Sequence, residues 1–234
     1  MIEDILPVAV MAAEAYADVP ADPLDPATLL FPEEAAALTR AVPARQREYA
    51  TVRTCARRAM GALGLPPAPV VTGARGAPVW PRGVVGSMTH CRGYRAAVVA
   101  RTADAVTIGI DAEPATPTTE RFLASVSLPG ERESVRELTD RRPDVPWSRI
   151  LFSAKESVFK AWYPLTGRTL DFDQAHVDID ADASAFTAAL RTPGPVVAGR
   201  TLSGFEGRWL CRGGLVVTAI VLTPDHRPQT SRHG

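Results

Sequence analysis

The chain has 234 residues, of which 46% are apolar and 22% are charged, an ordinary composition for a globular protein with a substantial core. Its 26 basic and 26 acidic residues cancel, which argues against a general nucleic-acid or membrane-surface binder, since such proteins carry a strong positive charge. No apolar run approaches the length of a membrane span, and the acidic start Met1-Ile-Glu-Asp is unlike a secretory leader.

Periodicity and the positions of glycine and proline indicate the elements of the first half. An apolar stripe at helical spacing, with arginines elsewhere, predicts one long helix that Gly64 and the prolines after it would end. Clustered glycines and prolines predict loops, and short apolar runs bounded by turn residues predict strands. In chain order, the expected elements are an irregular segment over 21–32, a helix over 44–63, a loop over 73–86, and strands over 94–101 and 105–111.

The second half again has helices followed by strands. Pro146 suits the first turn of a long helix, and Pro164 and Gly167 would end that helix near Tyr163. The near-continuous apolar run before Thr223 is typical of a buried strand. The expected elements are helices over 118–125, 130–140 and 144–163, and strands over 175–180, 184–190, 204–211 and 214–222.

This helix-then-sheet order in both halves predicts an α+β protein made of two lobes of similar size. The predicted parts are an N-terminal lobe at 1–104, a C-terminal lobe at 105–222 and a polar, disordered tail at 223–234. Three cysteines, Cys55, Cys91 and Cys211, lie far apart and outside any metal-ligand spacing. We therefore expect reduced thiols in a cytoplasmic protein.

Lysine is nearly absent from the chain. Arginine supplies 24 of the 26 basic residues, and the two lysines, Lys155 and Lys160, lie on either side of Glu156. Arginine keeps its proton, whereas lysine is a compact ammonium whose pKa moves readily on burial. The pair therefore indicates a site that needs an ammonium group; the alternative is an arginine-biased composition with chance clustering.

Two acidic residues stand at the end of the strand expected over 105–111. Asp111 and Glu113 are two residues apart, and Pro114 follows them. Residues i and i+2 of a strand project from one face, so one carboxylate would be driven neutral unless a cation compensated the pair. The pattern indicates a metal site, with two ordinary acids at a solvated strand end as the alternative.

A polar face runs along the expected long helix, because its members are spaced by four, three and four residues. The members of this face are Arg149, Ser153, Glu156 and Lys160. Glu156 would be a third metal ligand and Lys160 a phosphate partner; the alternative is an exposed ion pair of about 0.2–0.5 kcal/mol. Three carboxylates without histidine or cysteine make an all-oxygen site, which suits Mg²⁺ with water and substrate phosphate.

Cationic groups for a phosphorylated ligand lie in the first half. The first long helix and its approach carry Arg45, Arg47, Arg53, Arg57 and Arg58. Arg75 lies in the glycine-rich loop, whose backbone N–H groups could also meet an anion, and His90 precedes a turn into a strand. A solvated helix face and a structural histidine are the alternatives.

Three segments in this order resemble the surfactin-type 4′-phosphopantetheinyl transferases, especially the actinobacterial and enterobactin-type branch. These segments are Gly86-Ser-Met-Thr-His90, Ile108-Gly-Ile-Asp-Ala-Glu113 and Phe152-Ser-Ala-Lys-Glu-Ser-Val-Phe-Lys160. Support comes from the arginines between Arg45 and Arg57 and from Gly76-Ala-Pro-Val-Trp-Pro81, so the resemblance spans residues 40–222. Phe152 departs from the tryptophan that often opens the third motif, and it still supplies an apolar anchor.

The resemblance implies two pseudo-symmetric α+β lobes with the active site between them. It implies transfer of the phosphopantetheine arm of coenzyme A to a serine of an apo acyl, polyketide or peptidyl carrier protein, with release of 3′,5′-ADP. Asp111, Glu113 and Glu156 would hold Mg²⁺, or Mn²⁺, together with the pyrophosphate. Glu156 would also be the base for the carrier serine, directly or through a water.

Further roles follow from the same resemblance. Lys155, Lys160 and His90 would neutralise phosphoryl charge, and Arg45 and Arg53 would bind the 3′-phosphate. The implied catalytic groups are Glu156, Lys160 and His90. The implied coenzyme A contacts are Arg45, Arg53, Arg75, Ser87, Thr89, His90, Lys155 and Lys160.

Two other functions fit parts of the pattern. A Mg²⁺-dependent nuclease or phosphodiesterase uses similar clusters, but usually places its second acid and lysine on adjacent strands, and this chain has no basic excess for DNA. A non-catalytic module that binds coenzyme A or a carrier protein would need no complete carboxylate set. The residues leave open which carrier proteins are served. Two lobes can complete a site within one chain, so we expect a monomer without nucleic-acid or membrane partners.

Overall fold

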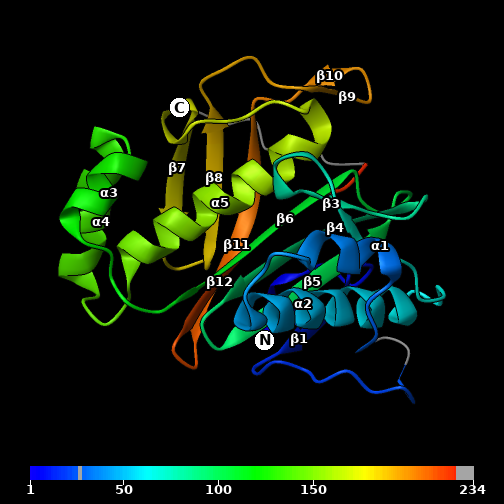
Figure 1. Cartoon of the computed structure of the whole chain (residues 1–234). Coiled ribbons are helices and arrows are strands. Elements are labelled where there is room, and N and C mark those ends of the chain that lie inside the picture. Colours follow the sequence, from blue (N-terminus) through cyan, green and yellow to red (C-terminus); the bar gives the residue numbers. More distant parts are fainter. Residues whose placement is uncertain (26–27, 225–234) are drawn as a thin grey trace.

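The computed structural model describes residues 1–25 and 28–224, so the predicted disordered tail lies outside the described residues from 225 onward. Figure 1 shows two adjoining parts, each with a sheet and one long helix packed against it. The predicted α+β class with two parts is confirmed. All three cysteines are free, as expected. Within the described ranges, no helix combines the length and apolar character that a membrane span requires.

The N-terminal part is a three-stranded antiparallel sheet in the order β1-β5-β4, with α2 packed on β5 and β1. Its elements are η1 (Ile2–Ile5), β1 (Met11–Ala15), α1 (Pro32–Ala35), η3 (Ala36–Leu38), α2 (Pro43–Ala62), β2 (Val71–Thr72), η4 (Ala74–Gly76), β3 (Pro78–Val79), β4 (Val84–Cys91) and β5 (Tyr94–Arg101). The predictions for α2 and β5 are confirmed. The sequence prediction lacks β1, a run of small residues, and β4, whose start falls in the stretch predicted as a loop.

The C-terminal part is a five-stranded antiparallel sheet in the order β6-β12-β11-β8-β7. Its elements are β6 (Thr107–Pro114), α3 (Glu120–Val126), α4 (Pro129–Arg141), α5 (Trp147–Thr166), η5 (Phe172–Gln174), β7 (Ala175–Asp180), β8 (Ala185–Leu190), β9 (Val196–Val197), β10 (Arg200–Thr201), β11 (Gly204–Arg212) and β12 (Leu215–Leu222). The predicted helices and strands are all present. α5 runs past its predicted end. Pro164 lacks an N–H and removes only one hydrogen bond in the last turn, so the helix continues to left-handed Gly167 (φ 63°).

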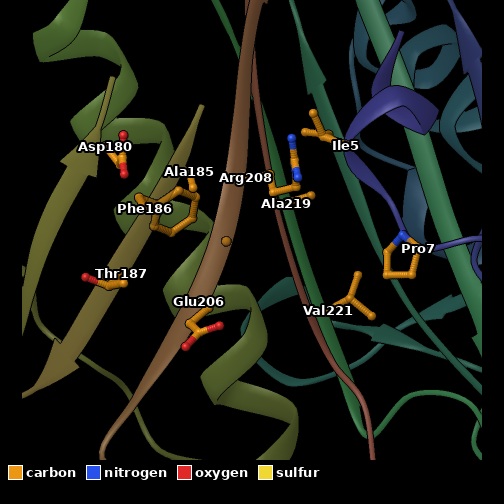
Figure 2. A pocket seen from close by; sticks show the side chains of 11 residues that line it. Ile5, Pro7, Asp180, Ala185, Phe186, Thr187, Glu206, Arg208, Ala219 and Val221 are labelled. Atoms are coloured by element: carbon orange, nitrogen blue, oxygen red, sulfur yellow. The ribbon is translucent and has the colours of Figure 1, made fainter. Parts of the chain in front are cut away.

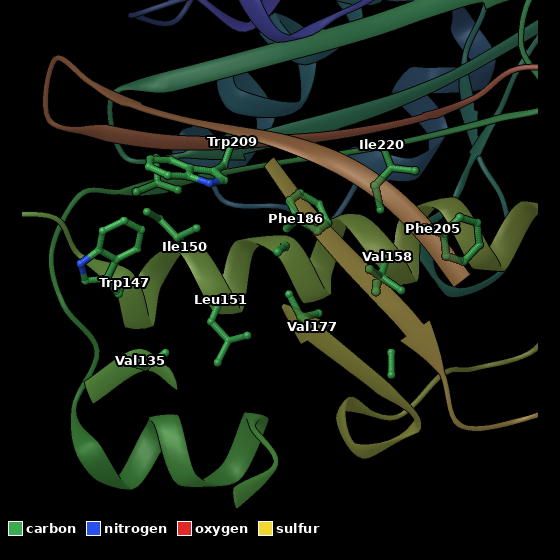
Figure 3. Packing of buried hydrophobic residues seen from close by; sticks show 14 of the residues in the cluster. Val135, Trp147, Ile150, Leu151, Val158, Val177, Phe186, Phe205, Trp209 and Ile220 are labelled. Atoms are coloured by element: carbon green, nitrogen blue, oxygen red, sulfur yellow. The ribbon is translucent and has the colours of Figure 1, made fainter. Parts of the chain in front are cut away.

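The main core of this part lies between α5 and the sheet. Figure 3 shows apolar side chains of α5 facing those of the strands. From α5 come Trp147, Ile150, Leu151 and Val158, and from the strands come Val177, Phe186, Phe205, Trp209 and Ile220. Trp147 and Trp209 meet edge to face, with ring centroids 5.4 Å apart. Because this apolar face holds α5 on the sheet, the opposite, polar face of the helix has a defined position.

The two sheets meet where their edge strands β4 and β6 adjoin. Two hydroxyls of β4 take the place of a strand partner: Ser87 Oγ accepts the N–H of Ile110 at 3.1 Å, and Thr89 Oγ1 accepts the N–H of Ala112 at 3.1 Å. Both hydroxyl residues are buried. Edge N–H groups that would be costly to bury unpaired are thus satisfied across the boundary between the two parts.

A buried glutamate fixes the start of one helix in each part, α1 in the N-terminal part and α4 in the C-terminal part. In the N-terminal part, Glu34 is fully buried at the third position of α1 and accepts the backbone N–H groups of Phe31 (3.0 Å) and Val70 (2.8 Å). Its carboxylate is paired at 2.9 Å with Arg57 of α2. One side chain therefore connects the short helix, the long helix and the segment before β2.

Glu131 repeats this arrangement in the C-terminal part. It is the third residue of α4, and its carboxylate accepts the N–H groups of Leu128 (2.6 Å) and Val177 (2.7 Å). Its cation is Lys155 of α5, at 2.9 Å. Both short helices begin with an apolar residue, proline, any residue and glutamate, Phe31–Glu34 and Leu128–Glu131. This likeness supports the predicted pseudo-symmetry of the two parts.

Gly109 lies where β6 passes beneath α5. A Cβ there would come within 2.0 Å of the carbonyl oxygen of Ser157 and 2.7 Å of the backbone nitrogen of Ala161, so strand and helix would have to separate. We expect Gly109→Ala to lower the free energy of unfolding by about 3 kcal/mol, the upper end of overpacking effects. Urea denaturation followed by circular dichroism measures this change.

Gly61 in α2 is the matched control. No atom lies within 4 Å of a Cβ built there, so Gly61→Ala should raise stability by about 0.5–1 kcal/mol through helix propensity. Equal stabilities of the two variants would contradict the close approach of β6 and α5.

Candidate active site

Asp111 of β6 is held by side chains from two neighbouring elements, β4 and α5. Its Oδ1 accepts from Lys160 Nζ of α5 at 2.7 Å and from Thr89 Oγ1 of β4 at 3.3 Å, and its Oδ2 accepts from Ser153 Oγ of α5 at 2.9 Å. The residue is 5% exposed. A buried carboxylate on β6 is therefore held by both neighbouring elements, and its position is determined by where the two parts of the chain meet.

Glu113 and Glu156 complete a group of three carboxylates around α5 and β6. Glu113 is paired with Arg149 at 3.0 Å. Glu156 is half-buried on the face of α5 that also carries Lys160. Burial, and after it the neighbouring charge of Asp111, raises the pKa of both glutamates. The predicted polar face of the long helix is confirmed, since Arg149, Ser153 and Lys160 all contact acids of β6.

The fit of this group to a metal ion rests on its chemistry. In residues 1–25 and 28–224, no set of three or more His, Cys, Asp or Glu side chains is placed so as to hold a metal as it stands. The donor set nevertheless suits a divalent cation. All its oxygens are carboxylate, and the like charge of Asp111 adds to burial in raising the pKa of Glu113 and Glu156, which a bound cation would offset.

His90 stands at the end of β4 within a cluster of charges. Glu48 Oε1 of α2 lies 3.0 Å from His90 Nδ1, and Arg45 Nη1 lies 2.9 Å from His90 Nε2 and 2.6 Å from Glu48 Oε2. Arg95 of β5, the cross-strand partner of His90, lies 3.8 Å from Glu48. The sequence prediction includes neither Glu48 nor Arg95. Two features of the sequence could have indicated them: the register of a hairpin that turns at Gly93 places Arg95 opposite His90, and i, i+3 spacing places Glu48 beside Arg45.

Arg53 lies deeper in α2 than Arg45 does. Its guanidinium stacks on Tyr49, 3.3 Å from the ring centroid, and donates to Val70 O (3.2 Å) and Thr72 Oγ1 (2.9 Å). Burial lowers its pKa to about 10, and the positive charge of Arg45 contributes to the shift. Arg53 therefore belongs to the same positive region as Arg45, with a fixed orientation.

A cavity of about 450 Å³ opens between the two parts. Its walls are mostly apolar, with Trp80 and Tyr163 among them, and they include the cations Arg75 and Lys160 and the hydroxyl of Ser87. Arg75 has φ 53°, a left-handed conformation that residues other than glycine rarely adopt. Apolar walls with two cations suit a ligand that has both a planar ring and phosphate groups.

A second cavity, of about 480 Å³, lies away from these residues. Figure 2 shows Ile5 and Pro7, at and just after η1, near Ala219 and Val221 of β12, with Glu206 on β11. None of the predicted site residues lines this cavity. The candidate site is therefore the cavity between the two parts, one wall of which includes Lys160, the partner of Asp111.

The structure corrects the roles predicted for Lys155 and Thr89. Lys155 is 3% exposed, and its Nζ contacts Glu131 Oε1 (2.9 Å), Phe172 O (2.6 Å) and Ala175 O (2.9 Å). An ammonium has three donors, so none remains for a phosphate. The Thr89 hydroxyl is likewise engaged by Ala112 and Asp111, so it orients the carboxylate and has no proton left for coenzyme A.

Comparison with known proteins gives concordant matches. The family model described as 4′-phosphopantetheinyl transferase N-terminal domain matches residues 33–100, and that of the 4′-phosphopantetheinyl transferase superfamily matches residues 107–204. The chain is 60% identical to the 4′-phosphopantetheinyl transferase Svp of Streptomyces mobaraensis, over 100% of the chain and 94% of that protein. It is 42% identical to PptT of Mycobacterium tuberculosis (95% and 98% covered) and 45% identical to Npt of Nocardia iowensis (94% and 99% covered), both also 4′-phosphopantetheinyl transferases.

The two lysines should differ in their contribution to stability. Lys155→Met leaves Glu131 buried without its cation and should lower the free energy of unfolding by about 3–5 kcal/mol. Lys160→Met makes the same change on the same helix, but that side chain is 26% exposed, so we expect a loss of about 1 kcal/mol. Denaturant unfolding of both variants compares the two positions, and equal losses would contradict the interior placement of Lys155.

Proposed function

Because the chain belongs to the 4′-phosphopantetheinyl transferase superfamily, whose reaction moves a phosphopantetheine group to a carrier protein, we propose that coenzyme A binds in the cavity between its two parts. Family membership decides against the nuclease and the binding-only module. Enzymes of this family take coenzyme A as substrate and in general use a divalent metal. The observation that carries the proposal is the position of Lys160, which lines the cavity and contacts Asp111.

The nucleotide end of coenzyme A carries the 3′-phosphate, which needs cations. Arg45 and His90 lie together at the end of β4, and Arg53 adds positive charge from the same helix as Arg45. Guanidinium groups bind phosphate through two parallel hydrogen bonds, so these residues form the proposed 3′-phosphate site. The cavity that Lys160 lines offers Trp80 and Tyr163 for the adenine ring and Arg75 for further phosphate charge.

Asp111, Glu113 and Glu156 are the residues that would hold the divalent cation, Mg²⁺ or Mn²⁺, since both ions prefer oxygen ligands. A bound ion of this kind offsets the charge of a pyrophosphate. The environment of Glu113 and Glu156 supports the assignment: burial and, after it, the charge of Asp111 raise the pKa of both groups, and a bound cation would favour their ionised form.

The chemistry requires a base, because a serine hydroxyl is a weak nucleophile. Glu156 is the proposed base: its pKa is raised by burial and by Asp111, which brings a carboxylate closer to the pH at which it can take a proton. Lys160 stabilises charge on the leaving phosphate and can also release a proton to it, which arginine cannot do. A smaller hollow of about 210 Å³, with Glu156, Phe159 and Phe172 in its walls, is the proposed place of the pantetheine arm.

Transfer itself is the direct test. An apo acyl, polyketide or peptidyl carrier protein incubated with this protein, coenzyme A and Mg²⁺ should gain the mass of one phosphopantetheine arm. Omission of coenzyme A or of the divalent metal should abolish the gain, and a carrier whose serine is replaced by alanine should remain unchanged. Intact-mass spectrometry gives the answer. No gain on any of the three carrier classes, from folded protein, would refute the function.

The 3′-phosphate site has its own test. Arg45→Ala should weaken coenzyme A binding about tenfold, as expected for loss of a charged hydrogen bond, and should change 3′-dephospho-coenzyme A binding less than about twofold. Arg58→Ala, also on α2 but paired with Asp25 on the surface, is the control and should leave both affinities unchanged. Calorimetry measures them. An equal loss for both ligands on Arg45→Ala would make Arg45 an ordinary surface charge.

A further inference from the structure

Both ring nitrogens of His90 are engaged by side chains of α2. Glu48 Oε1 lies 3.0 Å from Nδ1, and Arg45 Nη1 lies 2.9 Å from Nε2. A guanidinium can only donate, so Nε2 must be the acceptor and carries no proton. The ring proton is then on Nδ1, where the Glu48 carboxylate accepts it. This pattern describes a neutral histidine whose tautomer is set by Glu48.

The charges that face His90 come from three elements. Glu48 and Arg45 lie on α2, Arg95 on β5 and Lys160 on α5. Burial lowers the pKa of His90 most, the three cations lower it further, and Glu48 opposes them. The direction of this shift agrees with the neutral imidazole that the Arg45 contact requires, and the one carboxylate in this set is the group that would favour its charged form.

An arriving phosphate changes this balance. Its anionic oxygens compete with Nε2 for the Arg45 guanidinium, and a charge-assisted hydrogen bond to phosphate is the stronger of the two. Nε2 is then left beside an anion, which favours the imidazolium. One proton passes from solvent to Nε2, and that new N–H donates to a phosphate oxygen. The Nδ1 proton stays on the side of Glu48.

We propose that Glu48 is a positioning residue of the coenzyme A site: it keeps the His90 proton on Nδ1 and balances the imidazolium, so that binding of the 3′-phosphate takes up a proton at Nε2. This inference rests on the proposed binding of coenzyme A at Arg45 and His90. The Glu48 carboxylate lies 2.6 Å from Arg45 and would repel a bound phosphate. It therefore lowers the affinity for an anion, so its presence needs another explanation, which its contact with His90 provides.

A purely structural Glu48 would behave differently. As a surface ion pair with Arg45 it would contribute a few tenths of a kcal/mol to stability and would not couple binding to protons. Proton uptake on binding makes the affinity fall as pH rises, with a slope of log Ka against pH equal to minus the number of protons taken up. The phosphate itself, with a second pKa of about 6, is almost fully ionised by pH 7.5 and adds little to that number.

The experiment counts protons by calorimetry in metal-free buffers of different ionisation enthalpy at pH 7.5. The wild-type protein should take up about half a proton or more per coenzyme A bound. 3′-Dephospho-coenzyme A should give a clearly smaller value. Both ligands carry the pyrophosphate, so their difference cancels any titration of Glu113 or Glu156 and isolates the 3′-phosphate. Glu48→Gln should reduce this difference by at least about half, since an amide cannot balance an imidazolium.

Two further variants make the result specific. His90→Gln should remove the difference between the ligands, and Glu48→Gln in that background should change it no further. Glu133→Gln breaks an i, i+3 pair with Arg136 of the same 2.6 Å length as the Glu48–Arg45 pair, on α4 and not among the charges that face His90, and should leave the count unchanged.

Coenzyme A binding with no extra proton uptake over the dephospho ligand would overturn the inference and leave the proposed function standing. An unchanged count in Glu48→Gln would overturn it as well. Absence of any coenzyme A binding would refute the proposed site and this inference together.

Discussion

The close approach of α5 to β6 places the acidic groups of the candidate site and the cations that pair with them. The apolar face of α5 is held on the sheet by Trp147 and its neighbours, so its polar face turns toward β6. Gly109 lets the two backbones approach to a distance that no side chain would permit, and this brings Ser153 and Lys160 into contact with Asp111. The acids of β6 and the cations of α5 thus meet as a consequence of core packing, which is why small changes at Gly109 should affect the whole molecule.

The repeated buried glutamate explains one of the two lysines. Glu34 and Glu131 each cap a short helix, bind a distant backbone N–H and pair with a cation of the long helix. The cation in the N-terminal part is Arg57, and in the C-terminal part it is Lys155. Lys155 has a carboxylate and two carbonyl oxygens around it. The three tetrahedral donors of a lysine ammonium match these acceptors better than the planar guanidinium of an arginine would. Of the two lysines of the chain, Lys160 therefore lies in the candidate site, and Lys155 holds α4 and α5 together.

Three ion pairs join charged groups of the candidate site. Lys160 is paired with Asp111, Arg149 with Glu113 and Arg45 with Glu48. A divalent cation and a phosphate bound as proposed would compete with these partners for the same side chains. Their binding would exchange one ion pair for another on side chains that folding has already desolvated, and the proton uptake proposed at His90 would be part of that exchange.

Local spacing determined much of this protein by itself. Periodicity of 3.6 and 2 gave α2, α5 and most strands, and i, i+2 and i, i+4 spacing grouped Asp111 with Glu113 and Glu156 with Lys160, because neighbours in one element share a face whatever packs on it. Only the tertiary structure determined which face of a helix or strand packs in the interior and which face lines the candidate site. Lys155 and Lys160 are five residues apart, about 140° around the helix, so one enters the interior and the other the site. Glu48 and Arg95 join His90 across 42 (90 − 48) and five (95 − 90) residues. The contact of Glu48 with His90 depends on the packing of α2 against β4 and β5, which no local pattern contains, whereas the place of Arg95 opposite His90 follows from the hairpin turn.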